Sequence, residues 1–331
     1  MAETNITGPL WGYEQRSRRL AGLWPTSFYV APISTQRAIF GYGQVSTNYY
    51  SLTNLVSNTG VVATDTAGVG TARFALAAAG YGGDKAIFGY GATSVYAVDG
   101  ASMTNKVSNT GVVASDTTGV GTIRRQLAAA GYGTDKAIFG YGYGYIDQYT
   151  GSLYYSMTNK VSNTGVVASD TTGVGTGRTS LAAAGYGTDK AIFGYGNTGS
   201  TGGLVSITNL VSNTGVVATD TAGVGTAREG SAAAGYGGDK AIFGYGYASA
   251  RVSITSLVSN TGVVASDTAG VGTDRSALAA AGYGTDKAIF GYGFSGSSTA
   301  ITNLVSNTGV VANDTTGVGT ARHYPAAAAY G

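Results

Sequence analysis

The stretch Ala86-Ile87-Phe88-Gly89-Tyr90-Gly91 decides the fold, because versions of it recur through almost the whole chain. The six copies begin at Ala38, Ala86, Ala137, Ala191, Ala241 and Ala288. Each copy is followed by a version of Ser57-Asn58-Thr59-Gly60-Val61-Val62-Ala63, then by an Arg such as Arg73, and then by Leu76-Ala77-Ala78-Ala79-Gly80-Tyr81-Gly82. A fixed period of roughly fifty residues indicates a solenoid, a propeller or an array.

The composition is that of a folded chain with one repeated domain. Of the 331 residues, 55 are Gly and 11% are charged, yet Val, Ile, Leu and Tyr are frequent enough to build a core. We therefore expect one repeat domain over residues 37–331, preceded by a non-repeat arm over residues 1–36. No apolar stretch is long enough to cross a membrane, and the first residues do not resemble a signal peptide.

The charge and the absence of Cys exclude several classes of function. With no Cys, the chain has no disulfide, no thiolate nucleophile and no Cys-metal site. The net charge of +2 leaves no basic surplus for nucleic acid. We expect Asp84 to pair with Lys85 and Asp65 with Arg73, as surface or turn pairs worth less than about 1 kcal/mol each.

One repeat predicts four short strands and no helix. The turn 82–85 separates two apolar runs, so residues 76–81 and 86–90 should be antiparallel partners. Asn58-Thr59-Gly60 predicts a second hairpin between residues 51–57 and 61–64. No segment has the 3.6-residue periodicity of a helix.

Six such units predict an all-β fold, a six-bladed β-propeller of four-stranded antiparallel blades. Small residues such as Ala77 to Ala79 suit the crowded centre, and Ile87, Phe88 and Val62 can fill the wider outer space. The first repeat has no Ala-rich strand before Ala38, while the chain ends with such a strand at residues 326–331. We expect this C-terminal strand to complete the first blade and close the ring, with residues 28–31 as the competing candidate.

These residues resemble the kelch β-propeller family, whose blades carry an aromatic-Gly-Gly strand ending and an Arg shortly before the innermost strand. Ile87-Phe88-Gly89-Tyr90-Gly91 stands at the place of the glycine doublet, and Arg73 stands before Leu76. The resemblance covers residues 37–331, although Gly-Tyr-Gly replaces the doublet and no repeat carries the Trp usual in kelch blades.

The near-identical Gly-rich repeats are also similar to kelch-like repeat proteins of marine tailed bacteriophages. This resemblance implies a virion protein of the tail or capsid surface. Its partners would be other virion proteins, host-surface glycans or host-surface proteins, and a homo-oligomer within an assembly is possible. The alternative is a secreted or cell-surface, lectin-like carbohydrate-binding propeller.

The inventory of reactive side chains predicts no enzyme and no cofactor. Some kelch-type propellers are copper radical oxidases, whose chemistry needs a Tyr crosslinked to Cys together with His ligands. This chain has no Cys and one His, His323, so it excludes that activity and predicts no metal site. Glycoside hydrolysis would need two acids at one pocket, and the non-repeated acids are scattered over different repeats. A glycan-active enzyme is the third, more distant hypothesis.

Recognition should use positions that differ between repeats. The segments after each Gly-Tyr-Gly vary in length, should emerge on one face, and combine Tyr with Ser and Gly as recognition loops do. The candidate ligand- or partner-binding residues are Tyr49, Tyr50, Tyr96, Tyr143, Tyr145, Tyr149, Tyr154, Tyr155, Tyr247 and Phe294. The alternative is that these rings only cover blade edges.

A second variable set flanks the repeated Arg. It consists of Phe74, Arg125-Gln126, Thr179-Ser180, Glu229-Gly230, Ser276 and His323-Tyr324. We expect this set at the opposite rim or on solvated loops.

The non-repeat arm holds both Trp residues and the one basic cluster of the chain. Its candidate assembly anchor is Trp11, Arg16, Arg18, Arg19 and Trp24. Trp and Arg are enriched at interface hot spots, so the arm either anchors the protein in an assembly or covers the underside of the ring.

Overall fold

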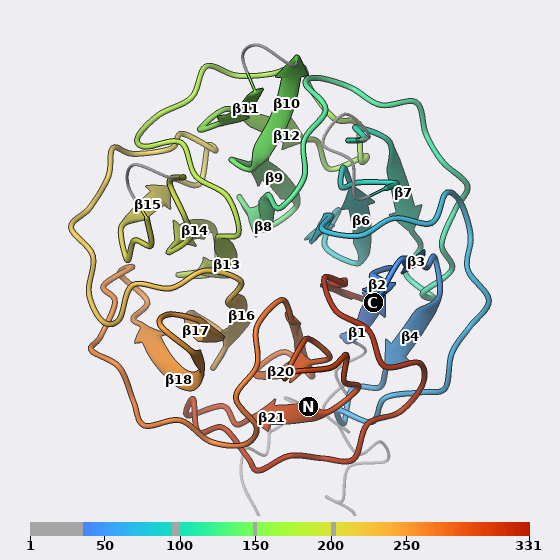
Figure 1. Ribbon diagram of the computed structural model, residues 1–331, viewed down its shortest axis with the longest axis vertical. Coiled ribbons are helices and arrows are strands. Elements are labelled where there is room, and N and C mark those ends of the chain that lie inside the picture. Colours follow the sequence, from blue (N-terminus) through green and yellow to red (C-terminus); the bar gives the residue numbers. More distant parts are fainter. Residues whose placement is uncertain (1–35, 95–99, 148–150, 200–202) are drawn as a thin grey trace, which may run out of the picture. The chain divides into compact units, whose positions relative to one another are not determined.

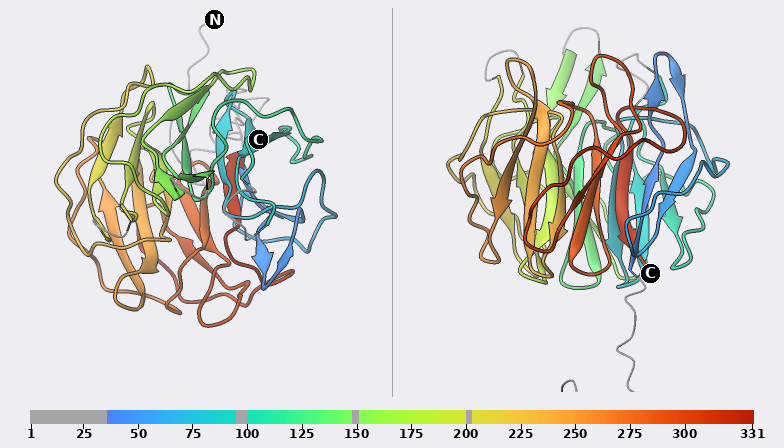
Figure 2. Two further views of the ribbon diagram at one scale, coloured as in Figure 1. Left: turned by 45° about the horizontal axis from the view of Figure 1, so that its top comes forward. Right: turned by 90° about the horizontal axis from the view of Figure 1, so that it is seen from below.

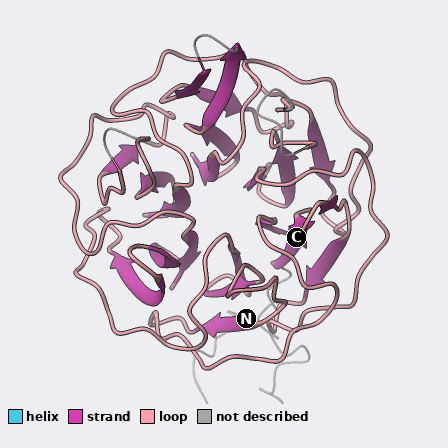
Figure 3. Ribbon diagram, in the orientation of Figure 1, coloured by secondary structure: helices cyan, strands magenta, loops and turns pink. Residues whose placement is uncertain are grey.

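The computed structural model describes residues 36–94, 100–147, 151–199 and 203–331. The chain divides into two compact units, Met1–Ser34 and Thr35–Gly331, close to the boundary predicted from the repeats. The first unit, with the predicted anchor residues, lies outside the described residues. The described part of the second unit is all-β, with no helix in it and therefore no helix that could cross a membrane (Figure 3).

The described residues of the second unit form six three-stranded antiparallel sheets (Figure 1). In order from the inner to the outer strand they are β22-β1-β4 (Ala326–Tyr330, Arg37–Gly41, Thr53–Val56), β5-β6-β7 (Ala77–Tyr81, Lys85–Gly89, Thr104–Val107), β8-β9-β12 (Ala128–Tyr132, Lys136–Gly140, Thr158–Val161), β13-β14-β15 (Ala182–Tyr186, Lys190–Gly194, Thr208–Val211), β16-β17-β18 (Ala232–Tyr236, Lys240–Tyr247, Arg251–Val258) and β19-β20-β21 (Ala279–Tyr283, Lys287–Gly291, Thr302–Val305). Two small hairpins are added, β2-β3 (Gln44–Val45, Asn48–Tyr49) and β10-β11 (Tyr143–Asp147, Gly151–Tyr154).

The first predicted hairpin of each repeat is confirmed. In the second sheet, β5 pairs with β6 from Ala77↔Gly89 to Tyr81↔Lys85. The turn needs residues with positive φ, and Gly82 and Gly83 adopt +65° and +81°. In the next repeat the second of these positions is Thr134, which takes the left-handed conformation at 68°.

The second hairpin forms, but its outer segment is shorter than predicted. Instead of a fourth strand at residues 61–64, the segment meets β4 at two isolated bridges, Val56↔Val62 and Thr53↔Thr66. The outer segment has one residue more than β4 between these bridges, so a regular ladder cannot continue. The buried Asn54 side chain bridges the interruption by donating from Nδ2 to the Ala63 carbonyl at 3.0 Å.

The core is divided into layers between neighbouring sheets. Between the second and third sheets, Ala77 and Ala79 of β5 pack with Ile87, and across the layer lie Leu127 and Phe139. Equivalent clusters lie between the other neighbouring sheets. A Cβ added at Gly89 would come within 2.7 Å of the Phe139 ring, so glycine lets the aromatic side chain of the next sheet approach. Small inner and larger outer residues thus fit the sheets together as predicted.

The first and last strands share a sheet, as predicted. β22 pairs with β1 from Arg37↔Tyr330 to Gly41↔Ala326. The inner strands contact one another in cyclic order, β22 with β5, then β8, β13, β16, β19 and again β22. Figure 1 shows the sheets placed around a common centre. The contacts of β22 with both β19 and β5 place it between these two strands. The competing segment, residues 28–31, lies outside the described residues.

Two closed cycles of backbone hydrogen bonds join the inner ends of the sheets. In the turn ring, the glycine after each inner strand donates its N–H to a carbonyl of the next sheet, at 2.7–3.0 Å. The turn ring comprises Gly82 to Asp135, Gly133 to Asp189, Gly187 to Asp239, Gly237 to Asp286, Gly284 to Gln36 and Gly331 to Asp84. The second cycle, at the other end of the inner strands, forms part of the candidate site.

Candidate binding face

The repeated Arg joins neighbouring sheets, and we call each such Arg together with the Tyr, Asn or Ser and Asp side chains that it contacts a strut. Arg124 is fully buried, and its guanidinium lies over the Tyr90 ring at 4.4 Å. Its Nη2 donates to Asn159 Oδ1 at 2.5 Å, and its Nη1 lies 3.6 Å from Asp170 Oδ1, both in the following repeat. The last Arg, Arg322, reaches Asn54 and Asp65 of the first repeat in the same way.

The predicted pairing of Asp65 with Arg73 is therefore wrong. Arg73 contacts Asp116 instead, with Nη1 3.5 Å from Oδ1, because the Arg reaches forward to the next repeat. All six Arg side chains are fully buried, so they are structural groups and not exposed turn residues. The prediction for Asp84 is confirmed, since its carboxylate pairs with Lys85.

The ionisation of these groups reflects their burial. Burial raises the pKa of Tyr90 to about 12, although the charge of Arg124 opposes the shift. Burial alone would raise the pKa of Asp170, but hydrogen bonds from Thr122 and Asn159, with Arg124 nearby, hold it below its ordinary value. Tyr90, Arg124 and Asp170 thus meet as a neutral phenol, a guanidinium and a carboxylate at neutral pH.

A second cycle of backbone hydrogen bonds, the neck ring, closes the other end of the inner strands. Its members are Ala75, Gln126, Ser180, Gly230, Ala277 and Tyr324. Each donates its N–H to the carbonyl of the preceding member, and Ala75 donates to Tyr324, at 2.8–3.1 Å. All six have φ between 51° and 59°, the left-handed region that five of them adopt without being glycine. The cycle of hydrogen bonds holds this less common conformation in place.

Directly outside the neck ring, each repeat places three residues side by side across its strands. We call these sets the cross-strand triplets. They are His323-Gln44-Tyr49, Phe74-Ala92-Gly100, Arg125-Tyr143-Tyr154, Thr179-Asn197-Leu204, Glu229-Tyr247-Arg251 and Ser276-Phe294-Ser298. The triplets occupy equivalent places in the repeats but share no common sequence. We call their end of the sheets the loop face and the opposite end the turn face, the upper and lower edges in the right-hand view of Figure 2.

The loop face holds a cavity of about 600 Å³. Its walls include Tyr143, Tyr154, Tyr247 and Phe294 from the predicted binding residues, and Thr179, Asn197, Glu229, Arg251 and Ser276 from the other triplet positions. Five neck-ring residues form its floor, all except Ala75. Below the floor, a space of about 70 Å³ continues between the inner strands.

An apolar cluster fills part of the loop face at the first two repeats. Tyr49 stacks on Phe74, with ring centroids 5.1 Å apart, and Tyr324 packs beside them at 6.2 Å from Phe74. Buried Ala75 and Ala92 complete this cluster. The open cavity is therefore bordered by the third to sixth repeats, and the face is asymmetric although the framework repeats.

The predicted binding residues thus separate into groups. Tyr143, Tyr154, Tyr247 and Phe294 line the cavity, whereas Tyr49 belongs to the apolar cluster. Tyr50, Tyr145 and Tyr155 are partly buried and do not line it. Tyr96 and Tyr149 lie outside the described residues.

The second variable set was predicted at the wrong place. Its members Thr179, Glu229 and Ser276 line the same cavity as the variable loops, not an opposite rim. Each forms a bridge to a loop residue, as Glu229 does to Tyr247. The sequence shows that both sets vary between repeats, but it does not show that they pair with each other. It also does not single out Asn197 and Arg251 as site residues, although both lie within the variable segments.

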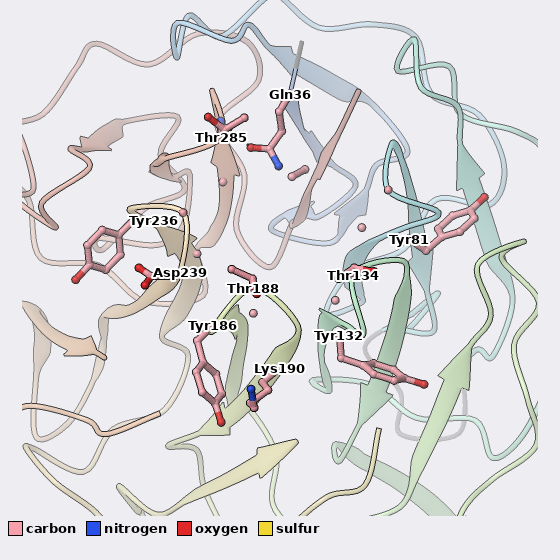
Figure 4. Close-up of a pocket in the computed structure, with 18 of the residues that line it drawn as sticks. Gln36, Tyr81, Tyr132, Thr134, Tyr186, Thr188, Lys190, Tyr236, Asp239 and Thr285 are labelled. Atoms are coloured by element: carbon pink, nitrogen blue, oxygen red, sulfur yellow. Dashed lines mark hydrogen bonds between the residues drawn. The ribbon is translucent and has the colours of Figure 1, made fainter. Parts of the chain in front are cut away.

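The turn face offers a different cavity, of about 290 Å³, lined by the repeated turns. In Figure 4, Tyr81, Tyr132, Tyr186 and Tyr236 point away from the centre of this cavity, while Thr134 and Thr188 lie closer to it. Five Lys residues line this cavity, and each forms an ion pair with the Asp that precedes it. The charges of these Lys residues are thus neutralised, and the lining is nearly the same in the second to sixth repeats, whereas the first repeat contributes Gln36.

Within the described ranges, no group of three or more His, Cys, Asp or Glu side chains could hold a metal ion. No protein-family model matches the chain, and no curated protein matches its sequence. The kelch and bacteriophage resemblances therefore stay predictions.

Proposed function

We propose that residues 37–331 form a six-bladed β-propeller that serves as a non-enzymatic recognition module and binds its ligand in the loop-face cavity. The cyclic order of the inner strands and the two hydrogen-bonded rings support the propeller. The three-stranded sheets with a bridged outer segment correspond to blades whose fourth strand is reduced to two bridges.

One observation carries the proposal of recognition. Two variable sets, separated along the sequence by the repeated strands, pair as triplets and line one cavity. A chain that repeats its framework six times but changes the residues at this cavity has the arrangement expected of a binding site on a rigid scaffold. The mixture of Tyr, Ser, Thr and Asn gives contact area and adaptable hydrogen bonding.

A non-enzymatic role fits the chemistry of the cavity. Glu229 is the one acid among its described lining residues, whereas glycoside hydrolysis in its usual form uses two carboxyl groups. The virion location, with Trp11 and its neighbouring Arg residues as an anchor, is the remaining part of the proposal. It predicts that the chain is found in purified bacteriophage particles at a fixed copy number.

Recognition is tested by probing the whole chain on a printed glycan array and with a phage-displayed peptide library. We expect reproducible binders that are lost when Tyr247→Ala and Phe294→Ala are combined. The matched control is Thr134→Gly on the turn face, where other repeats already carry Gly83 or Gly238. Binding that survives the double substitution, or no binder from either collection, would contradict recognition at this cavity.

A further inference from the structure

The triplet of the fifth repeat places a carboxylate, a phenol ring and a guanidinium in a row. Glu229 and Tyr247 exchange backbone hydrogen bonds of 3.0 and 2.8 Å, and Tyr247 is opposite Arg251 in the β17-β18 pair. Residues directly opposite one another in antiparallel strands have side chains on the same face. All three residues line the loop-face cavity, so their functional groups border the same space.

These three side chains retain unused binding capacity. Tyr247 is 40% exposed, and no aromatic or cationic side chain of the described residues stacks on its ring. The side chain of Arg251 forms no hydrogen bond or ion pair with any described residue, and its buried Nε has no partner. Glu229 accepts one hydrogen bond, from Asn197 Nδ2 to Oε2 at 3.2 Å.

The charges of Glu229 and Arg251 differ from the repeated charges of the framework, which are paired. Each of the six framework Arg residues lies within 3.9 Å of a carboxylate oxygen, and five Lys residues have an Asp partner. Glu229 and Arg251 border one cavity without forming such a pair in the described structure. The other donors of the Arg251 guanidinium and the remaining acceptor sites of the Glu229 carboxylate are therefore available to a ligand in this cavity.

We propose that the loop-face cavity binds a neutral pyranose sugar, which stacks on Tyr247 and forms hydrogen bonds with Glu229 and Arg251. This inference rests on the proposed recognition function. A hydroxyl both donates and accepts, so hydroxyls of one sugar can donate to the carboxylate and accept from the guanidinium. The C–H face of a pyranose ring is apolar and flat enough to cover an aromatic ring.

Charge and shape favour this ligand over others. An anionic ligand would approach the carboxylate of Glu229, and a cationic one the guanidinium of Arg251, whereas a neutral polyol meets neither repulsion. Phe294 lies under Arg251, with the guanidinium 4.6 Å from the ring centroid, and so holds this cation at the cavity wall. Tyr143 and Tyr154, stacked at 6.1 Å, form a further aromatic wall. A cavity of about 600 Å³ therefore has room and surface for a second sugar unit.

The test uses the whole chain and defined sugars. The probes are methyl glycosides of glucose, galactose, mannose and N-acetylglucosamine, with N-acetylneuraminic acid, glucuronic acid and glucosamine as charged comparisons. Saturation-transfer NMR reports contact, and calorimetry gives Kd. We expect a neutral glycoside to bind with its ring C–H protons most strongly saturated, and its disaccharide to bind more tightly.

Variants separate the three roles. Tyr247→Ala should raise Kd by about tenfold or more, while Tyr247→Phe, which keeps the ring, should change it by less than about threefold. Glu229→Gln and Arg251→Gln should each weaken binding, and Thr134→Gly on the turn face should not. Melting temperatures within a few degrees of the wild type would show that the variants are folded.

The possible failures are distinguishable. If no neutral glycoside binds but a peptide from the library does so through Tyr247 and Phe294, the sugar inference is wrong and the recognition function stands. Preferential binding of a charged sugar would show that the ligand is not neutral, but it would leave the proposal of a sugar site unchanged. A neutral sugar whose Kd is unchanged by Tyr247→Ala would show that this triplet is not its site, and absence of every binder would overturn both proposals.

Discussion

The loop face and the turn face are built on the same framework but differ in what their side chains do. Each is closed by six backbone hydrogen bonds in a cycle, the neck ring and the turn ring. On the turn face the second to sixth repeats carry the same Asp-Lys ion pair, whereas on the loop face the triplets differ in every repeat. Because backbone groups and buried struts close the structure, the triplet side chains are free to vary without loss of the fold.

The strongest test of this division removes part of the framework. Deleting residues 326–331 eliminates β22, the strand pairing with β1, the Gly331 bond of the turn ring and the buried Tyr330. The edge of β1 and the core layers on both sides of its sheet would then be exposed to water. We expect the loss to approach the whole stability of a domain of this kind, about 5–15 kcal/mol, and cooperative thermal unfolding to disappear.

A matched control keeps the strand but changes its sequence. Ala329→Gly restores the residue found at this place in the other repeats, as Gly131 or Gly185, and should leave a cooperative transition in calorimetry. A truncated chain that still melted cooperatively near the wild-type temperature would show that the sheets do not depend on cyclic closure.

Substitutions at two adjacent Arg residues allow a direct comparison of the framework with the variable loop face. Arg124 is fully buried in a strut, while Arg125 is the first member of a triplet and lies over the Tyr143 ring at 4.8 Å. Arg124→Ala should reduce the free energy of unfolding by about 3 kcal/mol or more, because Asn159 and the Tyr90 ring lose a buried partner. Arg125→Ala should cost less than about 1 kcal/mol.

Chemical denaturation of the two variants measures this difference. Because the substitutions remove the same side chain one position apart, changes in unfolded-state composition cancel to first order. Equal losses of stability would contradict the division into framework and variable face.

Much of the fold could be predicted because the same sequence pattern occurs six times in the chain. The Gly-rich turn before Lys85 and the Ala-rich strand at residues 326–330 led to the correct first hairpin and to the pairing of the first and last strands. The predicted length of the outer strand is too great, because the sequence does not reveal the extra residue between the bridges at Val62 and Thr66. The predicted pairing of Asp65 with Arg73 is wrong because each repeated Arg reaches an Asp of another repeat, as Arg73 reaches Asp116.

The site was harder to predict than the fold. Variable Tyr residues indicated the right face, since they follow the repeated Gly-Tyr-Gly. The partner of each loop residue follows the repeated Arg at the start of an inner strand, and only the bridges, such as Glu229 with Tyr247, bring the two sets together. The position of Arg251 beside Tyr247 depends on the length of the β17-β18 hairpin, which repeats elsewhere do not share.

The smallest expected effect concerns His323, the only His of the chain, which belongs to the triplet beside the first sheet. Burial lowers the pKa of His323 below its ordinary value, and its ring nitrogens contact Gln44 and Ser298 at 2.8 and 2.9 Å. The folded protein therefore favours the neutral ring, so the stability contribution is full above the unfolded pKa of about 6.5 and is lost as the pH falls below it. Melting temperatures at pH 7.5 to 5 should decline slightly in the wild type and remain level in His323→Gln, since no other side chain of ordinary pKa titrates in this window. A decline of the same size in both proteins would place the titrating group elsewhere, and a large decline in the wild type alone would mean that the loop face carries stability that we assign to the framework.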